Sequence, residues 1–148
     1  MPYIDRFQQH LLNKPLITVS TLELWASTLI NQSIQDDSKL FCPMIDARRM
    51  EVFTAVYNST LNNIMPPVAM VLDENSFSAL LHQQPIIFSG NGSVKWQKIC
   101  KHPNASFAKL TGISFALANL SHIAFLQHQF ADLAYTQPFY LKEFQNNI

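Results

Sequence analysis

The sequence predicts a single α/β (mixed α+β) domain over residues 1–148, with a three-stranded meander and flanking helices. Three observations predict this class. Segments with helical hydrophobic periodicity alternate with short apolar runs typical of strands. Two of these runs, 40–45 and 50–57, flank a charged turn, and a third at 68–72 follows a polar turn. No repeat, low-complexity tract or linker divides the chain, and 148 residues are enough to bury one core.

The first third of the chain predicts two helices separated by a strand. Residues 3–13 have apolar side chains at helical spacing, and Pro15 ends that helix because proline disfavours helical backbone in its predecessor. A brief buried strand is expected at 16–19. Ser20 and Glu23 then match a capping box, in which each side chain bonds one free amide of a helix N-terminus. The helix that follows has its apolar side chains on one face: Leu22, Trp25, Ala26, Leu29 and Ile30.

The rest of the chain continues this alternation of helices and strands. Pro66 and Pro67 precede the third strand of the meander and are expected to blunt a sheet edge. The longest predicted helix, 114–134, is apolar on most of its circumference and is therefore expected to be central. The other elements are expected in this order: helix 73–83, strand 85–88, helix 93–101, strand 105–110 and, after the long helix, strand 139–144.

Composition narrows the classes of function. Ten basic and ten acidic residues cancel, and only 14% of the residues are charged, so no direct binding of nucleic acid is expected. No apolar stretch reaches the length of a membrane span, and a soluble cytoplasmic protein is expected. Cys42 and Cys100 lie far apart in apolar surroundings, a pattern typical of reduced, buried thiols.

The residues nominate no catalytic group, no metal site and no cofactor. There is no His-Glu-x-x-His motif, and His122 and His128 are six residues apart rather than the four that place two ligands on one helix face. No Gly-x-Ser-x-Gly elbow is present. The apolar neighbours of Cys42 are expected to raise the pKa of its thiol and make it a poor nucleophile.

A charged hairpin between the first two strands of the meander is the first candidate site. It contains Asp46, Arg48, Arg49 and Glu51 within six residues of a weakly charged chain. As structure, Asp46 and Arg48 would pin the corner while Glu51 pairs an arginine across the strands. As a site, two adjacent arginines could bind a phosphate or the carboxylates of a partner. The structural interpretation is favoured, because a corner needs polar residues whether or not anything binds there.

The turn Gly90-Asn91-Gly92 is the second candidate, because it lies between a predicted strand and a predicted helix. Glycines at such a turn let the backbone approach a phosphate, and the free amides of the helix N-terminus would face it. The turn lacks the full Gly-x-Gly-x-x-Gly spacing and the Walker lysine. A tight turn is therefore the favoured interpretation, with phosphate contact as the alternative.

Four segments together resemble the TsaB (YeaZ) family, paralogues of the glycoprotease-like TsaD subunits. The resemblance covers residues 14–144, and the hairpin and the closing tail are its most specific parts. The four segments are the strand-to-helix run KPLITVSTLE at 14–23, the hairpin PMIDARRMEVF at 43–53, the turn SGNG at 89–92 and the tail AYTQPFYLK at 134–142.

The resemblance implies both a fold and a role. The fold is the second half of an actin-like, Hsp70-like ATPase fold, and the first half has no counterpart in this sequence. The role is that of a non-catalytic scaffold in making threonylcarbamoyladenosine beside the anticodon of tRNAs that read codons starting with A. The implied partners are a TsaD-like catalytic subunit and a TsaE-like ATPase.

Two alternatives stay open at this point. One is a glycoprotease-like (M22) peptidase homologue, which would need a nucleophile or a metal site that no motif nominates. The other is a self-associating domain, a homodimer in which surfaces normally covered by the first half of the family fold pair between copies. Low charge and eleven phenylalanines are compatible with apolar surface covered by a partner.

Overall fold

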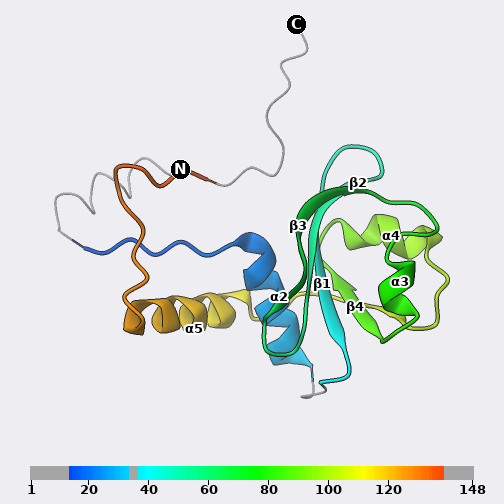
Figure 1. Ribbon diagram of the computed structural model, residues 1–148, viewed down its shortest axis with the longest axis horizontal. Helices are drawn as coiled ribbons and strands as arrows, with labels where there is room; N and C mark the ends of the chain where they lie inside the picture. Colours follow the sequence, from blue (N-terminus) through cyan, green and yellow to red (C-terminus); the bar gives the residue numbers. More distant parts are fainter. Residues whose placement is uncertain (1–13, 34–36, 139–148) are drawn as a thin grey trace, which may run out of the picture.

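The computed structural model describes residues 14–33 and 37–138, which form a five-stranded mixed sheet flanked by helices (Figure 1). The order of strands across the sheet is β3-β2-β1-β4-β5. The strands are β1 (Leu40–Asp46), β2 (Glu51–Tyr57), β3 (Asn63–Val71), β4 (Ile86–Ser89) and β5 (Ala105–Ala108). The helices are α2 (Thr21–Gln32), α3 (Ser78–Leu81), α4 (Ser93–Ile99) and α5 (Ile113–Leu126). The predicted mixed α/β class is confirmed.

The predicted meander forms one half of the sheet. β1, β2 and β3 pair antiparallel in sequence order, with Met44 opposite Thr54 and Thr54 opposite Val68. β4 lies on the other side of β1 and is parallel to it, and β5 is parallel to β4. The carboxyl ends of β1, β4 and β5 therefore meet at one edge of the sheet, a common position for sites in α/β proteins.

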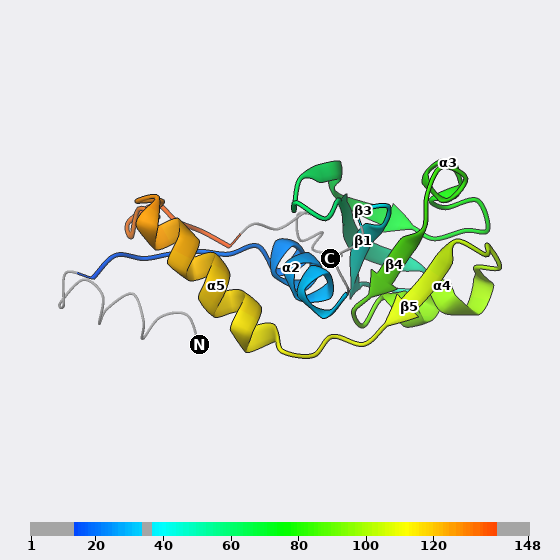
Figure 2. The ribbon, with the colours of Figure 1, turned by 90° about the horizontal axis from the view of Figure 1, so that it is seen from below.

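The two faces of the sheet are covered by different helices. Figures 1 and 2 place α2 on one face and both α3 and α4 on the other. Alternate residues of each strand point to opposite faces. The larger core lies under α3 and α4 and contains Leu40, Cys42, Met44, Val52, Val56, Leu72, Phe77, Leu81, Ile86, Phe88 and Trp96. The smaller core lies under α2 and contains Leu22, Ala26, Ala55 and Tyr57.

Helix α5 departs most from its prediction. It ends at Leu126 rather than at residue 134, and of its residues only Ala116 is buried. It lies outside α2, which separates it from the sheet (Figure 2). Its apolar circumference correctly predicts a helix, but the expectation that this helix is central is wrong.

Strand β3 and helix α3 also differ from their predicted ranges. β3 begins at Asn63 and includes Pro66 and Pro67, which an edge strand tolerates because it has one unpaired side. The pairing of β2 with β3 is irregular around these prolines. The helix expected at 73–83 is one turn, preceded by Phe77 in the left-handed conformation at φ 60°.

The start of the described chain contains less regular structure than expected. The strand expected at 16–19 is reduced to a single bridge between Leu16 and Ala131. Helix α2 begins after Ser20 as predicted, but no side-chain capping bond forms there, so the capping box is wrong. The helix expected at 3–13 and the strand expected at 139–144 lie outside the described residues.

No helix within the described ranges combines the length and the apolar character needed to cross a membrane.

Candidate functional site

The charged hairpin forms the corner between β1 and β2. The Ala47 amide donates to the Glu51 carbonyl at 3.1 Å, and the Glu51 amide donates to the Arg48 carbonyl at 3.1 Å. Arg49 takes the left-handed conformation, with φ 56°. The turn is thus closed by its own backbone, while the side chains of Arg48 and Arg49 are exposed.

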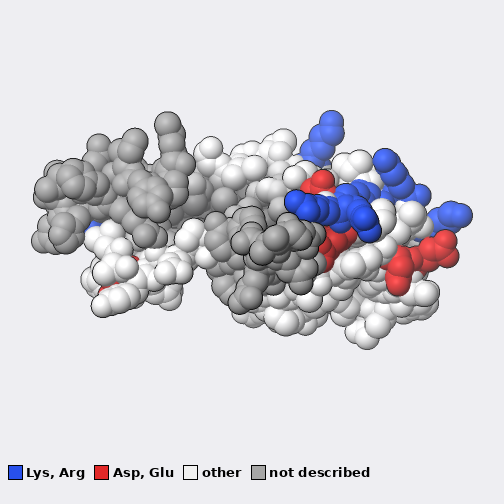
Figure 3. Space-filling model, turned by 90° about the horizontal axis from the view of Figure 1, so that it is seen from above, with Lys and Arg blue, Asp and Glu red and all other residues white. Residues whose placement is uncertain are grey.

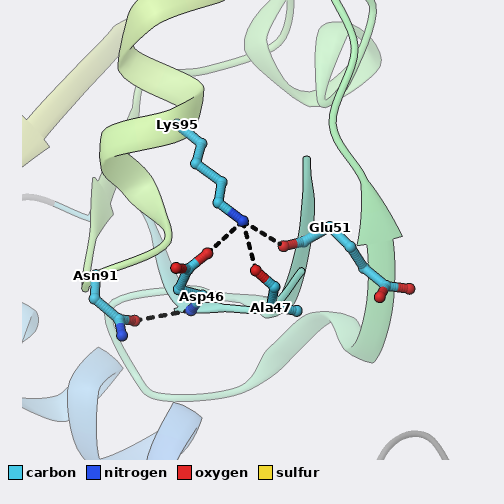
Figure 4. Close-up of polar contacts among 5 residues, drawn as sticks. All are labelled: Asp46, Ala47, Glu51, Asn91 and Lys95. Atoms are coloured by element: carbon cyan, nitrogen blue, oxygen red, sulfur yellow. Dashed lines mark hydrogen bonds and ion pairs between the residues drawn. The ribbon is translucent and has the colours of Figure 1, made fainter. Parts of the chain in front are cut away.

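Lys95, in the first turn of α4, binds this corner and links it to α4. Its ammonium group forms an ion pair with the Asp46 carboxylate (Figure 4). It also donates to the Ala47 carbonyl at 2.7 Å and to the Glu51 carbonyl at 3.2 Å. The Lys95 side chain is 20% exposed and that of Asp46 is 44% exposed, so the pair is partly shielded from water. Three acceptors around one ammonium group hold the two strand ends together.

The turn after β4 meets the same corner from the other side. The Asn91 side-chain oxygen accepts a hydrogen bond from the Asp46 amide at 2.8 Å (Figure 4). The Gly92 amide donates to the Met44 carbonyl at 3.0 Å. The two candidate sites identified in the sequence are therefore one assembly at the carboxyl ends of β1 and β4.

Close packing explains both glycines of this turn. Gly90 has φ +94°, and a Cβ there would collide with the Met44 carbonyl and the Trp25 ring. A Cβ on Gly92 would lie 2.9 Å from a methyl group of Val52. The glycines thus let the turn lie against β1, β2 and α2. Phosphate contact at residues 90–92 stays a prediction, and packing supplies a sufficient reason for the sequence of the turn.

A surface cavity of about 610 Å³ lies beside the turn. It opens where β4 and β5 end, between Trp25 of α2 and one side of α4. Most of its lining is apolar, with polar groups from Asn91, Gln97 and Lys109. Its size is within the usual range of small-molecule sites. The full lining is Trp25, Gly90, Asn91, Ser93, Val94, Gln97, Phe107, Ala108, Lys109 and Leu110.

Two buried acids on the central strands have raised pKa values. Burial raises the pKa of the Cys42 thiol to about 12, although a hydrogen bond with Thr54 opposes this shift. Burial and the nearby charge of Glu23 raise the pKa of the Tyr57 hydroxyl to about 12. The expected apolar setting of Cys42 is confirmed, and its thiol stays protonated at neutral pH.

The contact between Asp46 and Lys95 is the part of the site that sequence reasoning missed. In the sequence, Lys95 belongs to a locally basic helical segment with Lys98 and Lys101, and no local pattern links it to the hairpin. The signal that could have found it is a lysine three residues after the glycine turn, in the first turn of the predicted helix. The predicted pairing of Glu51 with an arginine stays a prediction. Within residues 14–33 and 37–138, no group of three or more His, Cys, Asp or Glu side chains could hold a metal ion.

Comparison with known proteins identifies the fold. A scan against models of protein families found no match, and neither did a search of curated proteins. Among solved structures, YeaZ from Pseudomonas aeruginosa matches with a TM-score of 0.66 and 18% identity, over 93% of this chain and 65% of that one. An uncharacterized protein with similarity to peptidase YeaZ from Pseudomonas aeruginosa matches with a TM-score of 0.70 and 19% identity, over 94% of this chain and 64% of that one.

The described fold is therefore of the YeaZ type, which is actin-like and ATPase-like in architecture. The chain spans a little under two thirds of the length of these two structures. At this level of identity the likeness establishes the fold, and function has to be argued from the site.

Proposed function

We propose that this chain is a non-catalytic, TsaB-like scaffold module in the biosynthesis of threonylcarbamoyladenosine in tRNA. In this role it supports a TsaD-like catalytic subunit, and a TsaE-like ATPase joins the complex. The observation that carries the proposal is the extent of the YeaZ-type fold, which accounts for 93–94% of the chain. The hairpin whose sequence resembles that family joins two central strands of this fold.

The geometry of the corner supports a docking role. Lys95 and Asn91 hold the backbone on either side of the turn, while Arg48 and Arg49 remain exposed on it. Because the backbone of the turn is already ordered, docking would restrict only the two arginine side chains, whose guanidinium groups suit an acidic surface. In the view of Figure 3, most of the visible charged side chains lie at the end of the molecule away from α5.

Reconstitution tests the proposal. The chain is mixed with the TsaD-like subunit and the TsaE-like ATPase of its own organism, and threonylcarbamoyladenosine is measured in a tRNA that reads codons starting with A. We expect the product to increase over the mixture without the chain, together with a complex visible by size-exclusion chromatography. If the chain forms no complex and leaves the product unchanged, the proposal is wrong.

A charge-reversal variant tests the docking role of the corner. Arg48→Glu with Arg49→Glu should weaken the complex, because each change replaces a cation with an anion on the proposed contact. The matched control reverses two exposed lysines near the end of α4, Lys98→Glu with Lys101→Glu, for the same change in net charge. Equal weakening by both double variants would show that net charge, rather than the corner, governs assembly.

A peptidase is the second candidate, because the description of one structural neighbour names peptidase YeaZ. The raised pKa of Cys42 argues against the thiol as a nucleophile. Incubation with an unfolded protein substrate, with and without chelators and serine-protease inhibitors, tests this activity. Inhibitor-sensitive cleavage that copurifies with the chain would replace the scaffold proposal.

A further inference from the structure

Asn91 and Gly92 form a dipeptide that can react with itself. The sequence contains this single Asn-Gly pair, and every other asparagine precedes a residue with a side chain. No Cβ on Gly92 hinders its backbone nitrogen, and a glycine in a flexible chain adopts conformations closed to other residues. This nitrogen is therefore well suited to attack the side-chain carbonyl carbon of Asn91. The reaction is deamidation, and the sequence makes Asn91 its most reactive position.

Deamidation at this pair has two steps. The Gly92 nitrogen first loses its proton to a base in the solvent and bonds to Cγ of Asn91. The bond between Cγ and the side-chain nitrogen breaks, and ammonia leaves with a proton taken from the solvent. Water then opens the resulting succinimide ring at either of its carbonyl groups, which leaves aspartate or isoaspartate at position 91. The only co-reactant is water.

The fold withholds the attacking nitrogen. The Gly92 amide donates to the Met44 carbonyl at 3.0 Å, and Gly92 is buried. Solvent base cannot remove the amide proton while this bond is intact, for the same reason that buried, bonded amides resist hydrogen exchange. A Cβ on Gly92 would lie 2.9 Å from a methyl group of Val52 and 3.1 Å from the carbonyl carbon of Ile45. The backbone of Gly92 is therefore closely packed and has little room to turn toward the side chain of Asn91.

The fold also holds the group that would be attacked. The Asn91 side-chain oxygen accepts a hydrogen bond from the Asp46 amide at 2.8 Å (Figure 4). Ring formation moves this side-chain carbonyl, so it requires the bond to Asp46 to break. Asn91 itself is exposed, so access of water to its side chain does not limit the reaction. The two hydrogen bonds to β1, one from each residue of the pair, supply the protection.

We infer that Asn91 is a latent deamidation site, which the native corner protects and which opening of the corner releases. The corner joins β1 and β2 to the turn after β4, so modification at Asn91 is a permanent chemical mark that this junction has opened. The inference does not depend on the function proposed above, because it concerns the chemistry of this chain alone.

The two products of the reaction should differ in their effect on the fold. Aspartate leaves the backbone unchanged, and a carboxylate oxygen can still accept from the Asp46 amide. Isoaspartate places Cβ in the main chain and so lengthens the backbone before Gly92. The Gly92 amide cannot then reach the Met44 carbonyl without displacing closely packed atoms. A chain with isoaspartate at position 91 should therefore refold less stably than a chain with aspartate there.

Incubation of the native chain and of the chain unfolded in guanidinium, both at mildly alkaline pH, tests the inference. Peptide mapping with mass spectrometry measures the conversion of each asparagine. In the unfolded chain we expect Asn91 to react before every other asparagine. In the native chain its reaction should be at least about a hundredfold slower, because it proceeds only from the open form. Gly92→Ala, compared in the unfolded state where packing does not matter, should slow the reaction.

Lys95→Met tests whether the corner controls the reaction. It removes the ion pair with Asp46 and two hydrogen bonds of the corner, so the corner should open more often. At a temperature where the native wild-type chain reacts measurably, Asn91 should deamidate at least about fivefold faster in this variant. Lys98→Met, at an exposed position of the same helix, is the matched control and should react like the wild type.

Two results would contradict the inference. One is an equal rate of deamidation at Asn91 in the native and unfolded chains, which would show that the two hydrogen bonds to β1 give no protection. The other is an equal rate in native Lys95→Met and native wild type, which would show that opening of the corner does not release the Gly92 nitrogen.

Discussion

At the scale of single residues, Lys95 should contribute more to stability than any other charged side chain of the corner. Replacing it by methionine keeps much of the apolar stem but removes the ion pair with Asp46 and leaves the Ala47 and Glu51 carbonyls without this donor. We expect Lys95→Met to lower the free energy of unfolding by about 1–3 kcal/mol. Urea denaturation measures the change. Lys98→Met, at an exposed position of the same helix, should stay within about 0.5 kcal/mol of the wild type, and equal losses would contradict the role of Lys95.

Alanine substitutions at the two glycines with positive φ allow the cost of backbone strain to be distinguished from the cost of steric collision. Gly90 and Gly112 have φ +94° and φ +72°, but only at Gly90 would a Cβ collide with neighbouring atoms. Gly112→Ala should cost about 1 kcal/mol, the usual cost of a left-handed alanine. Gly90→Ala should cost roughly 3 kcal/mol or more, because Met44 or Trp25 has to move as well. Thermal or urea unfolding of both variants gives the comparison, and equal destabilisation would show that the turn relaxes without cost.

The sequence identified most residues of the corner but could not reveal the contact that organises it. The charged hairpin stands out in the sequence, because its four charged residues are neighbours in a weakly charged chain: Asp46, Arg48, Arg49 and Glu51. Lys95 is distant in sequence and reaches Asp46 only because β4 pairs with β1. Local patterns predict strands, whereas the choice of neighbouring strand depends on packing across the whole sheet.

At the scale of elements, α5 is positioned through α2 and the link that precedes α5. The Gln32 side-chain nitrogen (Nε2) donates to the Lys109 carbonyl at 3.2 Å, and the Gln32 side-chain oxygen (Oε1) accepts from the Thr111 backbone amide at 3.3 Å. Gln32→Ala should leave the free energy of unfolding within about 1 kcal/mol, because these bonds are exposed. It should nevertheless speed amide exchange and protease cleavage around residues 109–113. Asn62→Ala, which affects a different turn, is the control, and unchanged exchange at 109–113 would show that packing alone holds α5.

Two of the mispredicted elements, α5 and β3, differ from their predictions for different physical reasons. The helix predicted at 114–134 is apolar around its circumference. This pattern indicates that its apolar side chains become buried, but it does not identify the element that buries them. Its outer face is uncovered in the described fold, so the expectation of a central position is wrong. Pro66 and Pro67 suggested a later start for β3, but a strand at the sheet edge can contain prolines where its pairing is irregular.

At the scale of the whole molecule, the sequence predicted the class and the meander better than the arrangement of the sheet. Hydrophobic periodicity fixes the type of most elements, and short turns favour antiparallel neighbours, as found for β1, β2 and β3. β4 and β5 join the sheet in parallel through longer crossover connections, and local sequence patterns do not predict the path of such connections. The candidate site lies where these two halves of the sheet meet, which is why its parts were predicted separately and its assembly was not.

The raised pKa values of Cys42 and Tyr57 predict that the whole fold loses stability in alkali. Both groups stay protonated in the folded state up to a pKa of about 12, whereas their ordinary values are 9.0 and 10.0. The unfolded chain therefore releases protons first. The stabilising contribution is fully present below pH of about 9 and is lost as pH rises toward about 12, by up to about 1.4 kcal/mol per pH unit for each group.

Urea unfolding across this pH window measures the loss. The two groups lie in the cores on opposite faces of the sheet, so their ionisation should weaken both layers. Cys42→Ala should lower stability at every pH, because it removes buried volume, but should flatten the dependence on pH. Cys100→Ala, at a partly buried thiol, should keep the wild-type slope. If Cys42→Ala keeps that slope as well, the Cys42 thiol ionises in the folded state as readily as in the unfolded chain, and the core under α3 and α4 admits water.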